Sequence, residues 1–179
     1  MLKSPRHALG MLYARYHFRK SADECHSFQT AFTDARRLLL IMPLDGSPLF
    51  PVAPVVAMLA RRKREEEITV VVTEHGTEAL DALRRSPIIR LLPAEINAFF
   101  LPRRDVLARV MRTAYDAVID CNLDFQLPSG YICMESKAPV RIGFAGKRAD
   151  LFYNFQVQVT PTESRTARYE RLAHCLEMF

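Results

Sequence analysis

Several polar side chains in this 179-residue sequence follow short apolar runs, where they could carry acid–base or binding chemistry. The first is Asp45, which stands shortly after the run 38–42. In doubly wound parallel sheets, ligands bind outside the carboxyl ends of the strands. If the apolar runs are strands, the polar residues that follow them are candidate site residues. This set comprises Asp45, Glu74, His75, Asp120, Asn122, Lys147 and Arg148, and Arg141 joins it because it flanks the same glycine-containing turn as Lys147 and Arg148.

Asp45 has two interpretations. It could act as a general base that takes a proton from a hydroxyl nucleophile. It could instead shape a turn, because Asp45-Gly46 is a favoured turn pair, and residue type alone favours this second interpretation. A base should be partly exposed at the end of its strand and free of a lysine or arginine partner, which would lower its pKa. A turn residue should instead accept hydrogen bonds from backbone N–H groups one to three residues onward.

The other candidates favour binding over catalysis. His75 could titrate near neutrality, or it could cap a helix or face solvent. Asp120 and Asn122 alternate along the chain, so both would point to one side as a polar floor. Arg141, Lys147 and Arg148 could hold a phosphate or carboxylate, although Arg148 could also pair locally with an acid two residues on.

Cofactors and metals are not expected. The sequence lacks both glycine-rich nucleotide fingerprints, G-x-G-x-x-G and G-x-x-x-x-G-K-[ST]. Two carboxylates without a matching histidine or third acid do not specify an ion. The four cysteines are scattered with no C-x-x-C pair, which favours reduced thiols in a cytoplasmic protein.

The apolar runs alternate with helical patterns. Their near-continuous hydrophobicity predicts strands that are covered on both faces. Alternation with helices predicts an α/β fold, a Rossmann-like, doubly wound and mostly parallel sheet. The predicted strands are 38–42, 68–73, either 88–92 or 98–101, 117–121 and 140–144. The predicted helices between them are 51–63, 77–84, 104–114 and 126–136.

Both ends of the chain also read as helical. In 7–20, Leu9, Leu12, Tyr13 and Tyr16 recur at helical spacing among basic residues. This extra basic helix and a polar connector form a predicted segment 1–34, ahead of a domain at 35–179. Near the C-terminus, Thr160 is predicted to cap a closing helix, with a proline and a glutamate at the matching positions.

The net charge is concentrated at one end. Residues 1–20 hold Lys3, Arg6, Arg15, Arg19 and Lys20 and no acid, while the remaining residues balance 20 basic against 20 acidic side chains, so the formal charge is +5. A basic arm suggests an anionic partner, such as a membrane surface or a glycolipid. The alternative is a solvated helix face. We expect no nucleic-acid partner, and a location in the cytoplasm or at the periphery of the inner membrane.

Three stretches resemble a known family. They are Tyr115-Asp-Ala-Val-Ile-Asp120 with the later Ser129, the segment Ala138-Pro-Val-Arg-Ile-Gly-Phe-Ala145, and the closing helix from Tyr169. In order and spacing they are similar to the N-terminal half of glycosyltransferase family 9, the ADP-heptose:lipopolysaccharide heptosyltransferases and their relatives. The resemblance covers 37–179 and implies a GT-B fold whose N-terminal, Rossmann-like half binds the acceptor.

The resemblance also implies a role for Asp45. In the family, the first loop carries the catalytic base, with a proline six residues after the acid, and Pro51 stands at that spacing here. The family's glycine before the acid is absent, and Gly46 follows it instead. In the family, a second domain binds the nucleotide sugar. We therefore expect an acceptor-binding half that needs a donor-domain partner chain for activity or, alternatively, a non-catalytic binding module.

Overall fold

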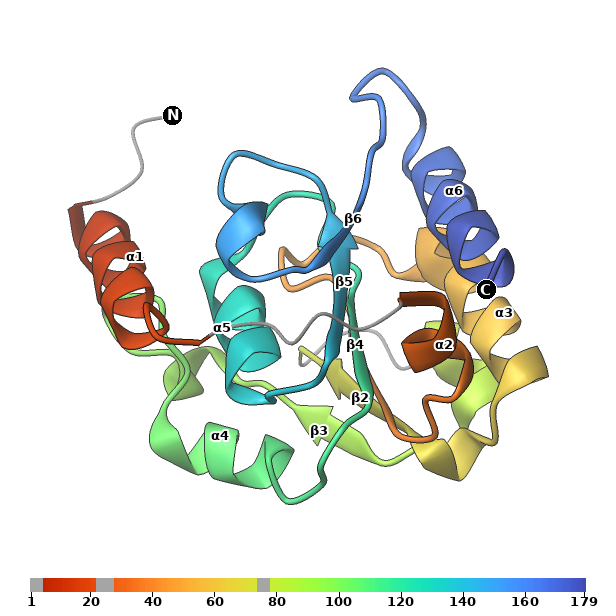
Figure 1. Ribbon diagram of the computed structural model, residues 1–179, viewed down its shortest axis with the longest axis horizontal. Helices are drawn as coiled ribbons and strands as arrows, with labels where there is room; N and C mark the ends of the chain where they lie inside the picture. Colours follow the sequence, from red (N-terminus) through yellow and green to blue (C-terminus); the bar gives the residue numbers. More distant parts are fainter. Residues whose placement is uncertain (1–4, 22–27, 74–77) are drawn as a thin grey trace.

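The computed structural model describes residues 5–21, 28–73 and 78–179. Its centre is a six-stranded sheet in the order β3-β2-β1-β4-β5-β6, in which every neighbouring pair is parallel. The strands are β1 (Leu38–Ile41), β2 (Ile68–Val72), β3 (Ile88–Arg90), β4 (Ala117–Asp120), β5 (Val140–Phe144) and β6 (Phe155–Val157). Figure 1 shows the strands side by side between two groups of helices. The predicted Rossmann-like α/β fold is confirmed.

The sheet is buried on both faces over most of its width. All residues of β1, β2, β4 and β5 are buried, as expected for parallel strands covered by helices. Strand β1 lies at the centre, where Leu38 faces Ile68 of β2 on one side and Ala117 of β4 on the other. The two outer strands, β3 and β6, are three residues long and only partly buried.

Asp116 and Tyr115, from the first stretch of the family resemblance, fix the entry into β1 and β4. One carboxylate oxygen of Asp116 accepts hydrogen bonds from the backbone N–H groups of Arg36 and Arg37, both at 2.8 Å. The hydroxyl of Tyr115 donates to the carbonyl of Val110 at 3.0 Å. Both side chains therefore secure the backbone at the amino ends of the strands.

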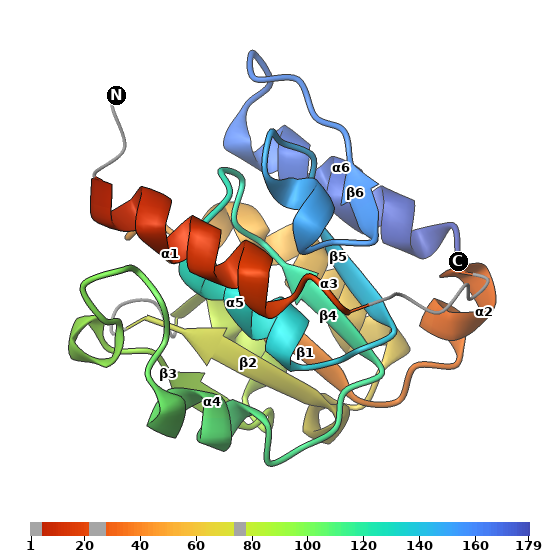
Figure 2. The same ribbon diagram turned by 60° about the vertical axis from the view of Figure 1, so that its left-hand side comes forward.

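Helices cover the two faces separately, as Figure 2 makes visible from a second direction. On one face, α2 (Phe28–Thr33), α3 (Ala53–Arg62) and α6 (Arg165–Glu177) enclose a core cluster that includes Leu40, Val70 and Ile119. On the other face, α1 (Pro5–His17), α4 (Arg104–Val110) and α5 (Leu127–Glu135) enclose a cluster that includes Leu39, Val71 and Val118. The 3₁₀ turns are η1 (Phe50–Val52), η2 (Glu65–Glu67), η3 (Glu78–Leu83), η4 (Pro93–Glu95) and η5 (Ala149–Leu151).

Several predicted boundaries differ from the structure. The third strand is 88–90, and the alternative at 98–101 is a loop. The helix predicted over 77–84 is a 3₁₀ segment from Glu78. The closing helix is capped by Ser164, whose hydroxyl accepts from the N–H of Ala167 at 3.1 Å, so the predicted cap at Thr160 is wrong. Thr160 instead closes a turn, because its carbonyl accepts from the N–H of Glu163 at 3.0 Å.

Helix α1 packs against α5 with one side and leaves the other exposed. Met11, Ala14 and Phe18 are buried in the same cluster as the sheet residues. The opposite side presents Leu9, Leu12, Tyr13 and Tyr16, each more than half exposed. Among the residues that the structure describes, no helix has the length and apolar character required to cross a bilayer.

Candidate functional site

The loops after β1 and β4 meet at one point of the sheet. Beyond β1 the chain order continues through β2 and β3 on one side, whereas β4 lies on the other side, so the gap between β1 and β4 is the topological switch point. Ligand sites in open α/β sheets form outside the strand ends at this point. The N–H of Leu44 donates to Oδ1 of Asn122 at 2.8 Å, which ties the two loops together. The structure thus brings the predicted residues Asp45, Asp120 and Asn122 to one edge.

The carboxylate of Asp45 is already engaged. Oδ1 accepts from the backbone N–H of Ser47 at 3.1 Å and from its hydroxyl, and Oδ2 accepts from Nη2 of Arg165 at 2.9 Å. Partial burial raises the pKa of Asp45, but the hydrogen bonds from Ser47 and Arg165 outweigh it, so the pKa lies below its ordinary value. The hydrogen bond from the Ser47 N–H matches the one expected of a turn residue, and the pair with Arg165 contradicts the expectation that a base would be free of an arginine partner. Its side chain is nevertheless 35% exposed and remains within reach of a ligand.

Asp120 forms the buried floor of this edge. Its Oδ1 accepts from the N–H and Nδ2 of Asn122 at 2.9 and 2.6 Å, and its Oδ2 accepts from the hydroxyl of Tyr153 at 2.5 Å. Complete burial raises the pKa of Asp120, and the hydrogen bonds from Ser129, Tyr153 and Asn122 offset only part of that rise. The floor therefore supports the first loop through Asn122, with its own polar atoms paired inside the protein.

The structure places the three basic candidates in different parts of the protein. Arg141 is buried near the start of β5, where Nε donates to the carbonyl of Phe152 at 3.0 Å and Nη1 to that of Ala138 at 2.8 Å. Lys147 is exposed in the turn after β5. Arg148 contacts Nδ1 of His7 at 3.3 Å, at the start of α1, so it does not pair with Asp150. Asp150 accepts from the side chain of Gln156 at 2.9 Å. The predicted anion site is thus divided between core, solvent and α1.

Two candidates, Glu74 and His75, lie outside the described residues. Within the residues that are described, no group of three or more His, Cys, Asp or Glu side chains could hold a metal ion.

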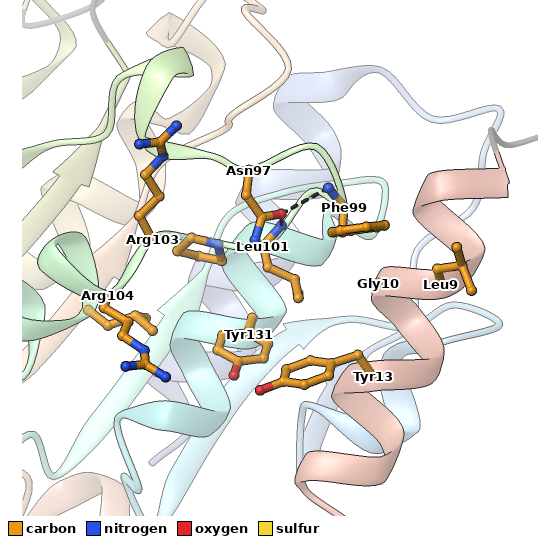
Figure 3. Close-up of a pocket in the computed structure, with 11 residues that line it drawn as sticks. Leu9, Gly10, Tyr13, Asn97, Phe99, Leu101, Arg103, Arg104 and Tyr131 are labelled. Atoms are coloured by element: carbon orange, nitrogen blue, oxygen red, sulfur yellow. Dashed lines mark hydrogen bonds between the residues drawn. The ribbon is translucent and has the colours of Figure 1, made fainter.

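The sequence did not lead us to a cavity of about 750 Å³ beside α1. It lies between that helix, the loop 97–103 and the helices α4 and α5, and Figure 3 shows its lining. The lining residues are Leu9, Gly10, Tyr13, Asn97, Phe99, Leu101, Pro102, Arg103, Arg104, Leu107 and Tyr131. One sequence feature could have indicated the cavity: the first helix has apolar residues on a second side as well. A helix that only packs against the rest of the domain does not need them.

The wall opposite α1 is a closed turn. Oδ1 of Asn97 accepts from the N–H groups of Phe99 and Leu101 at 2.9 and 3.1 Å, as the dashed lines in Figure 3 indicate. Phe100 has a φ of 63°, which lies in the left-handed region. Gly10 of α1 lies against this turn, and a Cβ there would stand 2.1 Å from the carbonyl oxygen of Phe99. Close approach of the helix therefore requires glycine at this position.

Comparison with known proteins yields structural matches only. No family model matches the sequence, and no curated protein gives a significant match. The solved structure of E. coli heptosyltransferase WaaC with ADP matches with a TM-score of 0.56 and 15% identity, over 78% of this chain and 46% of that one. A glycosyl transferase of family 9 from Veillonella parvula DSM 2008 matches with a TM-score of 0.49 and 17% identity, over 79% of this chain and 41% of that one.

These comparisons bear on the fold. The chain spans less than half the length of either solved structure. At 15% identity the likeness to WaaC shows a shared fold and not a shared activity. The resemblance to family 9 inferred from the sequence is confirmed at that level, because the structural match falls on a heptosyltransferase.

Proposed function

We propose that this domain is the acceptor-binding half of a glycosyltransferase-like protein related to the heptosyltransferases, acting in the synthesis of a cell-envelope glycan such as lipopolysaccharide. The supporting observation is the fold likeness to WaaC, a heptosyltransferase. The position of Asp45 outside the carboxyl end of β1, at the switch point, is compatible with this role. The donor half would come from a partner chain. The protein would work in the cytoplasm, at the periphery of the inner membrane.

In this proposal Asp45 is the base. Its carboxylate accepts the proton of an acceptor hydroxyl while that oxygen bonds to the anomeric carbon of the donor sugar, and the nucleotide diphosphate leaves with the bonding electron pair. The hydrogen bonds from Ser47 and Arg165 lower the pKa of Asp45 against the effect of burial, so the carboxylate is a weaker base while these contacts are present. The acceptor hydroxyl would have to replace Arg165 or Ser47 as a hydrogen-bond donor to Asp45.

A second candidate is a non-catalytic binding module with the same fold. The specific observation in its favour is the ion pair between Asp45 and Arg165 at 2.9 Å, combined with the turn hydrogen bonds from Ser47. A tight ion pair lowers the basicity of a carboxylate. In such a module Asp45 would shape the loop, and glycolipid binding would persist without any transfer.

A replacement experiment in the cells that produce the protein separates the two functions. The gene is deleted, or replaced by Asp45→Asn or by Asp124→Asn, which alters an exposed acid of the neighbouring loop. Envelope glycolipids are then profiled by mass spectrometry. A base role requires Asp45→Asn to reproduce the deletion profile while Asp124→Asn leaves the profile unchanged. A normal profile in Asp45→Asn cells, beside an altered deletion profile, would refute the catalytic role and leave the binding module.

A further inference from the structure

We propose that the cavity beside α1 binds an anionic amphiphile with a single alkyl chain, with its tail between α1 and α4, beside the contact of Gly10 with the turn 97–101, and its headgroup at Arg104. The proposal goes beyond the function above, because such binding needs neither a sugar donor nor Asp45. It concerns a site on the side of the molecule where α1, α4 and α5 meet, which Figure 3 displays.

The cavity has the size and lining of a ligand site. A volume of about 750 Å³ falls within the range of roughly 300–1,000 Å³ that is usual for small-molecule pockets. Its walls are mostly apolar, formed by Leu9 and Tyr13 of α1, Phe99 and Leu101 of the turn, and Leu107 of α4. Phe99 is 44% exposed and Leu9 55% exposed, so these side chains are left in contact with water that a ligand tail would displace.

The turn that forms one wall is preorganised. Asn97 fixes it with two hydrogen bonds to backbone N–H groups, and its own N–H donates to the carbonyl of Leu101 at 2.9 Å. An isolated antiparallel bridge between Ile96 and Pro102 closes its base. Because this wall is held without a ligand, less conformational entropy is lost on binding.

The charge at one side of the cavity selects an anion. Arg103 and Arg104 both line it, both are exposed, and neither guanidinium makes a hydrogen bond or ion pair with a described residue. Arg109 of the same helix contrasts with them, since its Nη2 is paired with Glu95 at 2.7 Å. Among the described residues, none of those that line the cavity is acidic. Figure 3 shows the two side chains directed to opposite sides, with the Arg104 guanidinium on the side of Tyr131, where it can bind a phosphate or carboxylate headgroup.

The lining favours an alkyl chain over a nucleotide. A base or ribose would need side-chain hydrogen-bond partners, and Asn97 is the lining amide that could supply them. Its oxygen is already shared by two backbone N–H groups. The hydroxyls of Tyr13 and Tyr131 are directed toward each other in Figure 3, and Tyr131 also interacts with Glu135. Glu135 in turn pairs with His17 at 3.0 Å. The remaining surface offers apolar contact.

The test uses the full chain and monoalkyl phosphates below their critical micelle concentrations, with affinity measured by isothermal titration calorimetry. Decyl and dodecyl phosphate should bind, and affinity should rise with chain length by up to about fourfold per methylene group buried. Inorganic phosphate should not displace them at millimolar concentration, which distinguishes an amphiphile site from a plain anion site. Dodecanol, which has the tail without the charge, should bind at least tenfold more weakly.

Variants locate the site. Arg104→Gln should weaken binding of dodecyl phosphate by about tenfold, the usual effect of losing one charge-assisted hydrogen bond. Arg85→Gln removes an exposed arginine before β3 and should change nothing. Leu107→Trp should fill the cavity and weaken binding, while thermal unfolding checks that the variant folds. Affinity independent of chain length, wild-type affinity in Arg104→Gln, or binding to anionic vesicles with none to the monomeric amphiphile would each overturn the proposal.

Discussion

Two regions use their polar groups in opposite ways: the switch-point edge, formed by the loops after β1 and β4, and the α1 face, formed by α1 and the cavity beside it. At the edge, Asp45 is paired with Ser47 and Arg165, and Asp120 is saturated by Asn122 and Tyr153. On the α1 face, large apolar side chains are exposed, and the guanidinium groups of Arg103 and Arg104 have no partner among the described residues. Acids such as Asp45 and Asp120 are therefore of a type that can catalyse reactions but here hold the loops of the edge in place. The unpaired arginines and exposed apolar side chains of the α1 face are better placed to bind a ligand.

The largest effect is expected on the α1 face. Replacing Arg6, Arg15, Arg19 and Lys20 by glutamine should reduce binding to anionic vesicles, because each basic residue near such a surface contributes roughly 1 kcal/mol, or several hundred-fold for the four together. Vesicle flotation at low and high salt measures this.

The matched control replaces four exposed arginines at the opposite, amino edge of the strands: Arg36, Arg37, Arg85 and Arg112. Equal losses in both quadruple variants would mean that net charge alone matters, and the basic residues of α1 would have no special part in binding.

The next largest effect is expected at the edge. Asp120→Ala should lower the free energy of unfolding by about 2–3 kcal/mol, because it leaves the buried groups of Asn122 and Tyr153 without their acceptor. Urea denaturation of this variant and of Asp124→Ala, which alters an exposed acid, measures the difference. Similar midpoints for the two variants would show that the buried network contributes little to stability.

A smaller effect concerns pH. Burial raises the pKa of Asp120 in the folded protein, so the folded state holds this proton more tightly than the unfolded state. The stability contribution of Asp120 is therefore largest below its ordinary pKa of about 3.9 and falls as pH rises toward the folded value. Asp120→Asn should remove that part of the pH dependence in thermal unfolding between pH 4 and 8. An unchanged profile would assign the dependence to other groups.

The smallest effect should come from the exposed pair. Arg165→Gln should cost less than about 1 kcal/mol, since the carboxylate of Asp45 and its partner are both more than one-third exposed. The pKa of Asp45 is lowered, so any contribution is present above the ordinary pKa of aspartate and is lost as pH falls through the folded value. A double-mutant cycle with Asp45→Asn measures the coupling, and a coupling above 2 kcal/mol would make this pair a structural element like Asp120.

Much of the fold could be predicted because its strands are continuous apolar runs. The four fully buried strands β1, β2, β4 and β5 all fall within predicted runs. Strand β6 was not predicted, since Phe155–Val157 is three residues long, only partly buried and separated from the 3₁₀ turn η5 by three residues. The helix cap was misplaced because Ser164 is as good a cap as Thr160, and local sequence does not decide between them.

The position of the candidate site could be predicted from the sequence, but the contacts of its residues could not. Strand order places Asp45 and Asn122 together, and their loops could be read from the sequence. Arg165, which neutralises Asp45, lies 120 residues later in the chain and no spacing rule connects the two. The cavity was missed because two segments of unrelated pattern, the first helix and the turn 97–101, form its walls only after folding.

The central place of β1 also bears on how the chain acquires its structure during synthesis. Leu38 must pair with Ala117 of β4, and the two are separated by more than half of the domain 35–179. At about 5–20 residues per second, roughly 4–16 s pass between the emergence of these two residues from the ribosome. Throughout that interval one edge of a wholly apolar strand has no neighbour, which is the kind of edge that recruits other chains. A nascent chain of this protein would therefore depend on early shielding of β1, and slowed translation after β2 should increase aggregation.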